Sequence, residues 1–335
     1  MLIGRQSWKF IFNPIIISSA TVGGPFEAKC QIAEDFDQFA SDLWLEQDSY
    51  EKAEVKLLEL ACNKALEKAK LKSDDINFLF SGDLDNQITS STFAARGLEI
   101  PYLGVFGACS TSMEGLALAS KVLDNNGANY VMAATASHNA AAEKQFRYPN
   151  EYGAQKPPTA QWTVTGAGAV ILGRQGEGPR ITSATIGKIV DMGISDPFNM
   201  GAAMAPAAVD TIETHFNELN IEPDYYDLIA TGDLGFTGYS IAQELFRKRG
   251  IHFKENLYTD CGMIIYGKDP RVFSGASGCA CSATVTYGHL LNRMKQGELK
   301  RILVAATGAL LSPMSYQQKE SIPGIAHAVS IENTQ

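Results

Sequence analysis

An internal duplication constrains the fold of this 335-residue chain more than any other feature of its sequence. The tripeptide Ala-Cys-Ser at 108–110 recurs at 280–282, and at the same offset MAATAS at 132–137 falls on VAATGA at 304–309. The Ala-Ala-Thr triplet is identical and lies equally far from both cysteines. A repeat of this length predicts two structural units that share one topology.

The match between the halves continues upstream of the cysteines. INFLFSGDLD at 76–85 resembles YDLIATGDLG at 226–235, with Gly-Asp-Leu in common. In both places an apolar strand is followed by a tight turn and a helix. This alternation predicts βαβ units with parallel strands and right-handed crossovers.

Hydrophobic periodicity predicts the same succession of elements in each half. In the first half we expect helices over about 50–70, 88–97 and 109–124, and strands over about 76–81, 102–106 and 129–135. In the second half we expect helices over about 202–219, 238–249 and 281–296, and strands over about 226–231, 256–260 and 301–307. Two further strands are expected at 165–173 and 324–332.

Charge and composition argue against several classes of protein. The net charge of −9, without a cluster of Lys and Arg, argues against unaided binding to nucleic acid or to an anionic membrane surface. No apolar run approaches the ~18–20 residues of a membrane-spanning helix, and Asn13-Pro14 interrupts the apolar N-terminal segment, so we expect neither a membrane span nor a signal peptide. The six cysteines contain no CxxC pair, which predicts reduced thiols in a cytoplasmic type of protein and argues against zinc.

Cys109 lies in VFGACSTSMEGLALA, at a predicted turn from strand to helix. Gly107 and Ala108 permit a sharp turn, and Ser110 and the hydroxyl residues after it suit the first turn of a helix. The helix dipole favours an anion there, so we expect the pKa of the Cys109 thiol to be lowered. The alternative is a small apolar side chain that packs between the halves.

The duplicated halves, the GACSTS turn and the segment TGAGAVILG at 165–173 together resemble the thiolase-like superfamily, which includes thiolases and ketoacyl synthases. The resemblance covers essentially the whole chain. It implies an α/β fold of duplicated βαβαβ halves in a five-layered α-β-α-β-α sandwich, with an N-terminal half over 1–173 and a C-terminal half over 174–335.

The catalytic pattern of that superfamily is incomplete here. Its condensing enzymes pair the cysteine with a His and with a second His or Asn from the second half. The matching positions read TGDL at 231–234 and GASGC at 275–279, without His or Asn, and Thr165 stands where the family carries Asp. We therefore expect a binding protein on a thiolase-like scaffold. The alternatives are a condensing or acyl-transfer enzyme that uses Cys109 with an atypical base such as His138, and a scaffold without a ligand.

The resemblance places a pocket between the halves at Cys109. The residues expected to bind a ligand there, or in the long segment 138–161, are Asp83, Cys109, Ser110, His138, Arg147, Tyr148, Asp233, Ser277 and Cys279. The paired aspartates are also open to a helix-capping role or to contact with a cation such as Ca²⁺. Basic and aromatic residues in 138–161 suit a planar aromatic dicarboxylate, or else belong to a solvated loop.

Within the superfamily, SGDLDNQITSS, SHNAAAEKQFRYPNEYG and FSGASGCACSA resemble a family of sporulation proteins. This resemblance implies binding of dipicolinic acid (pyridine-2,6-dicarboxylate), accompanied by Ca²⁺, for uptake into the developing spore. It implies no cofactor beyond that ion. The implied partners are membrane proteins of the same sporulation channel complex at the spore inner membrane, and a second copy in a homodimer.

Overall fold

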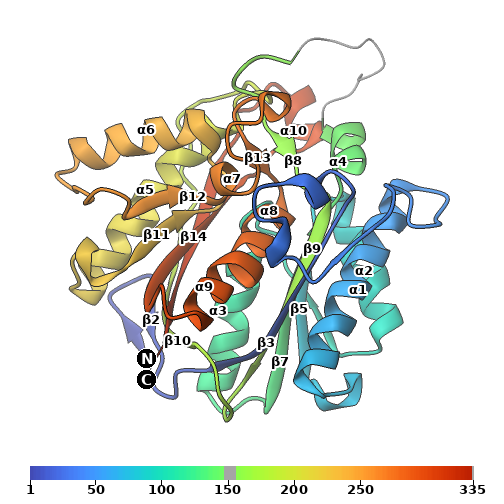
Figure 1. The fold of residues 1–335 in the computed structure, drawn as a ribbon. Helices are drawn as coiled ribbons and strands as arrows, with labels where there is room; N and C mark the ends of the chain where they lie inside the picture. The colour runs from blue at the N-terminus through green and yellow to red at the C-terminus, as the bar shows by residue number, and fades with distance from the viewer. Residues whose placement is uncertain (147–155, 334–335) are drawn as a thin grey trace.

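Two five-stranded sheet regions enclose a central layer of helices, and further helices cover their outer faces (Figure 1). The computed structural model describes residues 1–146 and 156–333. This arrangement confirms the expected five-layered α-β-α-β-α sandwich. The first sheet region has the order β6-β5-β7-β9-β3, from β3 (Ile15–Gly23), β5 (Phe78–Gly82), β6 (Tyr102–Gly104), β7 (Tyr130–Ser137) and β9 (Gly166–Gly173).

The second sheet region repeats this order as β12-β11-β14-β15-β10. Its strands are β10 (Arg180–Ile186), β11 (Leu228–Thr231), β12 (Tyr258–Asp260), β14 (Arg301–Ala309) and β15 (Gly324–Glu332). In both regions the three strands joined by helices run parallel, and the strand from the end of the half is antiparallel to its neighbours. The predicted duplication is therefore present in the topology.

The helices follow the predicted pattern. On the outer face of the first sheet region lie α1 (Tyr50–Ala69) and α2 (Thr89–Leu98), and on that of the second lie α5 (Met200–Leu219) and α6 (Gly235–Lys248) (Figure 1). The side chain of Ser49 accepts a hydrogen bond from Lys52 N–H and caps α1, whose apolar stripe packs on β3 and β9.

The central layer contains α3 (Thr111–Asp124) and the mirrored helix of the second half. That helix comprises α8 (Cys279–Thr284), a π-helical segment (Val285–Leu290) and α9 (Leu291–Lys295). Helix α3 packs against strands of both regions, and the hydroxyls of Ser112 and Ser282 hydrogen-bond across the helix pair at 2.7 Å. The two cysteine turns are thereby held together at one end of this layer.

The two sheet regions meet at β3 and β10, where only Arg180 and Ile15 are paired. The β1 (Leu2–Ile3) and β2 (Ser7–Lys9) hairpin crosses to the second half, since β2 pairs with β10. The Glu218 carboxylate in α5 accepts the backbone N–H groups of Arg5, Gln6 and Ser7. The first ten residues thus complete the sheet region of the other half.

Three features differ from the expectations. Strands β3 and β10 were not predicted, the helix expected from 109 begins at Thr111, and the expected long segment 138–161 begins as helix α4 (Asn139–Phe146). Residues 147–155 lie outside the described part of the chain. None of the described helices combines the length and apolar character needed to cross a membrane.

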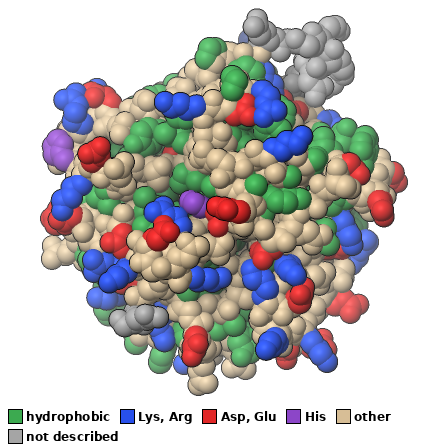
Figure 2. Space-filling model, viewed as in Figure 1, with side chains coloured by type: hydrophobic (Ala, Val, Ile, Leu, Met, Phe, Trp, Pro, Cys, Tyr) green, Lys and Arg blue, Asp and Glu red, His purple; other side chains and the backbone are tan. Residues whose placement is uncertain are grey.

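Acidic and basic side chains are interspersed on the face seen in Figure 2, with apolar groups between them. This distribution agrees with the mixed charge of the sequence. It gives that face no broad basic surface for nucleic acid.

Candidate functional site: a pocket at the paired cysteine turns

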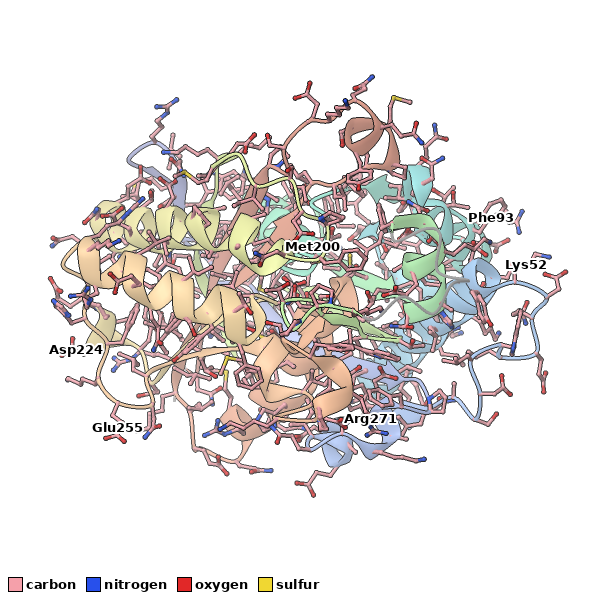
Figure 3. The ribbon with its side chains drawn as sticks, turned by 90° about the horizontal axis from the view of Figure 1, so that it is seen from above. Lys52, Phe93, Met200, Asp224, Glu255 and Arg271 are labelled. Atoms are coloured by element: carbon pink, nitrogen blue, oxygen red, sulfur yellow. The ribbon has the colours of Figure 1, made fainter. Side chains whose placement is uncertain are left out.

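An open pocket lies between the halves beside the turn that carries Cys109. It contains about 440 Å³ of empty space, including its open mouth. Figure 3 looks onto this side of the molecule, with Met200 at the start of α5 near the centre. The lining residues are mostly apolar: Leu84, Phe106, Ala108, Cys109, Ala142, Phe146, Thr163, Met200, Ser277, Ala309 and Leu311.

The Cys109 turn has the sharp geometry that the sequence predicts. Ala108 has a φ of 48°, a left-handed conformation that is unfavourable for a residue with a Cβ atom. The Ser110 hydroxyl donates to the Gly107 carbonyl at 2.6 Å, so it ties the turn together and does not cap the helix. Gly308 in β14 makes the fit possible, because a Cβ atom there would lie 2.2 Å from the Gly107 carbonyl oxygen.

The expectation of a lowered thiol pKa at Cys109 is wrong. The side chain is 7% exposed, and its burial, together with the nearby Asp233 carboxyl group, raises the pKa of the Cys109 thiol well above its ordinary value. Loss of water around the sulfur outweighs the helix terminus. The turn therefore holds a protonated thiol at neutral pH.

Asp233 lies at the position where the resemblance leads us to expect a catalytic partner of the cysteine. Its carboxylate accepts hydrogen bonds from the Thr307 hydroxyl at 2.7 Å and the Gly278 N–H at 3.0 Å, and it hydrogen-bonds the Cys109 thiol. Burial raises the pKa of Asp233 to about 7. The carboxyl group organises the turn but does not favour a thiolate beside it.

Asp83, the counterpart of Asp233, has different partners. It is fully buried and accepts the N–H groups of Asp85 at 2.8 Å and Ser91 at 2.6 Å. Burial raises the pKa of Asp83 to about 7. Neither aspartate lines the pocket, so the structure does not join them in one carboxylate site on its floor.

Ser277 and Cys279 flank the second turn. Ser277, in β13 (Ala276–Ser277), lines the pocket next to Thr163 of β8 (Trp162–Thr163), with which it is paired. Cys279 is fully buried, and its thiol donates to the Ala108 carbonyl at 3.1 Å. Cys279 thus stabilises the Cys109 turn through this hydrogen bond.

His138 does not reach the pocket mouth, contrary to the expectation. It is fully buried, and the Ala140 N–H donates to its Nδ1 at 3.2 Å, which leaves Nε2 to donate to the Leu43 carbonyl at 2.9 Å. Burial lowers the pKa of this imidazole. Because both ring nitrogens are engaged and the ring stacks on Tyr50, His138 lacks the geometry of a general base for Cys109.

The expected basic binding segment is only partly described. Arg147 and Tyr148 lie outside the described residues. Lys144 pairs with Glu51 at 2.7 Å and Lys156 with Glu143 at 2.9 Å. These two lysines therefore have carboxylate partners on the protein itself.

Sequence reasoning missed most of the pocket wall. Leu84 and Phe106 lie directly after or shortly before predicted site residues, so their positions were detectable. Ala142 and Phe146, both on α4, lie within the segment 138–161 that is expected to bind a ligand, whereas Met200 begins α5 and carries no local signal. Only the packing of the two halves brings them together.

Comparison with known families gives one whole-chain match. A family model described as stage V sporulation protein AD matches residues 4–332. The stage V sporulation protein AD of Bacillus subtilis (strain 168) is 51% identical over 332 residues, which cover 99% of this chain and 98% of that protein.

Solved structures of two bacterial proteins share the fold. The 3-oxoacyl-[acyl-carrier-protein] synthase III of Aquifex aeolicus aligns over 96% of this chain and 100% of its own, with 14% identity and a TM-score of 0.61. A single-substitution variant of Xanthomonas campestris OleA aligns over 98% of this chain and 100% of its own, with 15% identity and a TM-score of 0.65. At this identity the likeness establishes a thiolase-like fold and nothing of the activity.

Proposed function

The chain belongs to the stage V sporulation protein AD family, and from that premise we propose that it is a sporulation protein whose pocket at Cys109 binds dipicolinic acid for uptake into the developing spore. The observation that carries this proposal is the pocket itself, an apolar opening between the halves with two hydroxyl groups on its wall. Such a site suits a small planar ring with a few polar substituents.

The residues that line the pocket favour a ligand form without net charge. Leu84, Phe106 and Phe146 provide apolar and aromatic surface for the pyridine ring, and Thr163 and Ser277 offer hydroxyl donors to carboxylate oxygens. Among the described lining residues no side chain is cationic. We therefore propose that the neutral 1:1 chelate of dipicolinate with Ca²⁺ binds better than the free dianion, whose charge the wall leaves unbalanced.

The chemistry around Cys109 supports binding more than bond formation. The thiol is buried with a raised pKa, a carboxyl group stands beside it, and His138 is held elsewhere. A condensing enzyme without base or oxyanion donors loses several orders of magnitude in rate. Acyl transfer remains the competing function because Cys109 lines the pocket on a sharp turn.

Isothermal titration calorimetry with the preformed calcium chelate, and separately with sodium dipicolinate, tests the ligand. We expect saturable binding of the chelate, weakened at least about tenfold by Ala142→Leu, which narrows the pocket. Ala140→Leu, on the same helix but outside the lining, serves as the matched control. Absence of heat, or equal binding by both variants, contradicts the proposal.

Incubation with acyl-coenzyme A thioesters, followed by intact mass measurement, tests the enzymatic alternative. We expect no acyl adduct on the wild-type protein. A robust adduct that Cys109→Ala abolishes supports acyl transfer instead.

We further propose a homodimer formed at the edge strand β6. This strand pairs only with β5, and Leu103 and Phe106 beside this edge are 46% and 49% exposed. An unpaired edge with apolar side chains suits two-fold pairing with a second copy. Light scattering after size-exclusion chromatography should give twice the chain mass, reduced to the monomer by Leu103→Lys; a monomeric wild type contradicts this proposal.

We propose that membrane proteins of the same sporulation channel complex bring the chain to the spore inner membrane. Its net charge of −9 is unfavourable for direct adsorption to anionic lipid. Flotation with anionic vesicles should recover the protein only when those membrane proteins are present. Flotation with bare vesicles contradicts the proposal.

A further inference from the structure

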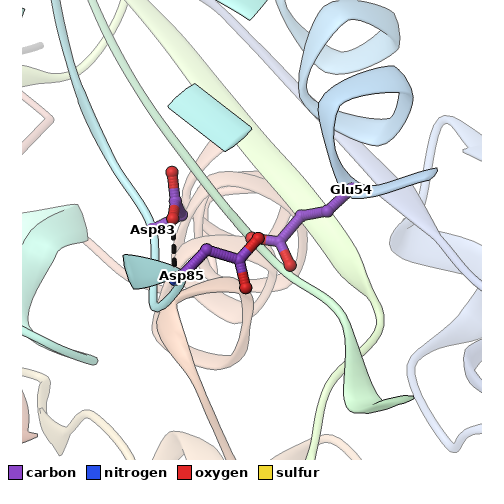
Figure 4. Close-up of side chains that lie close together, drawn as sticks. All are labelled: Glu54, Asp83 and Asp85. Atoms are coloured by element: carbon purple, nitrogen blue, oxygen red, sulfur yellow. Dashed lines mark hydrogen bonds between the residues drawn. The ribbon is translucent and has the colours of Figure 1, made fainter. Parts of the chain in front are cut away.

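Three buried carboxyl groups lie together behind the pocket wall (Figure 4). Glu54 comes from α1, and Asp83 and Asp85 come from the turn after β5. One oxygen atom from each lies within 4.8 Å of the other two, and the residues are 1%, 0% and 3% exposed. Among residues 1–146 and 156–333, no Lys or Arg forms an ion pair with any of them.

The donors around this cluster are unevenly distributed. Backbone N–H groups satisfy both oxygens of Asp83, and the Ser90 hydroxyl donates to Asp85 at 2.6 Å. Glu54 Oε1, in contrast, is buried and has no hydrogen-bond partner among the described residues. Its carboxyl group points toward that of Asp85 (Figure 4). A buried carboxylate oxygen without a donor is unfavourable unless a proton or a cation accepts its lone pair.

We propose that Glu54, Asp83 and Asp85 bind one Ca²⁺ ion. All three ligands are oxygens, which suits a hard cation. Calcium lies about 2.3–2.6 Å from its ligands, so oxygens up to about 5 Å apart can contact the same ion. Mg²⁺ requires near-ideal octahedral geometry at about 2.0–2.1 Å and fits an irregular carboxylate set less well.

Glu51, a partly exposed residue of α1, lies near this cluster. Glu51 lies one turn before Glu54 on α1, and it lines an open surface groove together with Thr89, the neighbour of Ser90. Ser90 Oγ is within hydrogen-bond distance of the Glu51 carbonyl at 3.1 Å as well as of Asp85. Ser90 therefore links the cluster to the helix turn that borders this groove.

The ion would fix one wall of the ligand pocket. Leu84 lies between the two ligating aspartates and lines the pocket, and Gln145 of α4 donates to its carbonyl oxygen at 3.1 Å. With Asp83 and Asp85 bound to one ion, the turn at 83–85 would be fixed by the ion as well as by its hydrogen bond to α4. The ion would bind at this cluster whichever ligand the pocket takes.

Terbium luminescence and thermal unfolding test the proposal with the metal alone, without dipicolinate. Tyr50, one turn before Glu54 on α1, can sensitise Tb³⁺. We expect one Tb³⁺ site per chain that Ca²⁺ displaces, and a rise in the unfolding temperature of about 3 °C in saturating Ca²⁺. An equal concentration of Mg²⁺ should give a smaller rise.

Glu54→Gln should weaken Tb³⁺ binding at least about tenfold and remove the calcium-induced rise. Glu67→Gln, an exposed residue on the same helix, should change neither. The proposal is overturned if Glu54→Gln binds as well as wild type. It is also overturned if the wild type shows no Tb³⁺ site. A rise in the unfolding temperature of Glu54→Gln without metal would then indicate that a shared proton holds the cluster together.

Discussion

The two halves use the same Gly-Asp-Leu turn for different purposes. In the second half, Asp233 accepts hydrogen bonds from the Gly278 N–H and the Thr307 hydroxyl of its own half and hydrogen-bonds the Cys109 thiol of the other half. In the first half, Asp83 accepts the N–H groups of Asp85 and Ser91 and joins the buried carboxyl cluster. The duplicated backbone has been kept while the partners of the two aspartates have diverged.

The threonines of the repeated Ala-Ala-Thr triplets show the same divergence. Thr135 donates to the Gly82 carbonyl at 2.6 Å, whereas Thr307 donates to the Asp233 carboxylate at 2.7 Å. Thr307 also accepts the Asp233 N–H at 3.0 Å. Threonine thus donates a hydrogen bond to a backbone carbonyl of the neighbouring strand in the first half and to a carboxyl group in the second half. Through Asp233, Thr307 of the second half therefore supports the turn of Cys109 in the first half, and Cys109 lines the pocket.

The largest expected effect concerns the two aspartates together. Burial raises the pKa of each from 3.8 to about 7, so between these pH values the folded state binds more protons than the unfolded state. The stability that these two carboxyl groups contribute should therefore be fully present below about pH 4 and be lost as the pH rises to about 7, by about 2–4 kcal/mol for each group. Urea unfolding at several pH values, in the presence of EDTA, measures this fall.

Asp83→Asn and Asp233→Asn should each make the stability less dependent on pH, by similar amounts. If only one variant does so, the two turns differ in protonation as well as in partners. A pH dependence that neither substitution changes contradicts the prediction outright.

The leucines that follow the aspartates should differ in their contributions to stability. Leu234 is fully buried in the core of the second half, whereas Leu84 is 9% exposed and lines the pocket. We expect Leu234→Ala to lower the free energy of unfolding by about 3 kcal/mol and Leu84→Ala by about 1–2 kcal/mol. Chemical denaturation measures both, and equal losses would contradict the assignment of Leu84 to a pocket wall.

The pair of strands that sequence reasoning missed shows where its limits lay. Strand β3 contains ISSATV at 17–22 and β10 contains ITSATI at 181–186, so the repeat also extended to these strands. Their Ser and Thr residues obscure the apolar pattern because they are buried and hydrogen-bonded: Ser18 donates to Ala65 and Ser19 to Tyr287. Periodicity alone fails for such strands, although a search for repeats would have found them.

The helices and the parallel strands were predictable because each carries its own apolar pattern, as α1 does. The raised pKa of the Cys109 thiol is not predictable from the sequence, because it depends on burial and on Asp233 from the other half. The pocket wall depends likewise on Ala142 and Met200, which approach Cys109 only after both halves pack. Local pattern thus predicts the elements, and tertiary packing decides the chemistry.

The threonines provide a direct measure of the divergence. A hydrogen bond to a buried carboxylate contributes more than one to a neutral carbonyl. We expect Thr307→Val to lower the free energy of unfolding by about 2 kcal/mol and Thr135→Val by about 1 kcal/mol. Both substitutions keep the side-chain shape, so urea unfolding at pH 8 compares the bonds themselves. A larger loss of unfolding free energy for Thr135→Val than for Thr307→Val would contradict the proposal that the bond to Asp233 is the stronger one.

The smallest expected effect concerns the reactivity of Cys109. Burial is the largest cause of its raised thiol pKa and the Asp233 charge is the next, so Asp233→Asn removes the largest cause after burial. We expect alkylation of Cys109 by iodoacetamide at pH 8 to become about tenfold faster, which corresponds to a fall of about one unit in the thiol pKa. Peptide mapping after timed quenching gives the rate at this cysteine.

Asp83→Asn provides the matched control, since Asp83 is not among the causes of the Cys109 shift. We expect it to leave the rate within about twofold of wild type. An equal acceleration by both variants would mean that the alkylation is faster because the fold is destabilised. Removal of the charge beside the sulfur would then not be the cause. Acceleration by Asp233→Asn alone would show that the Asp233 carboxyl group keeps this cysteine unreactive.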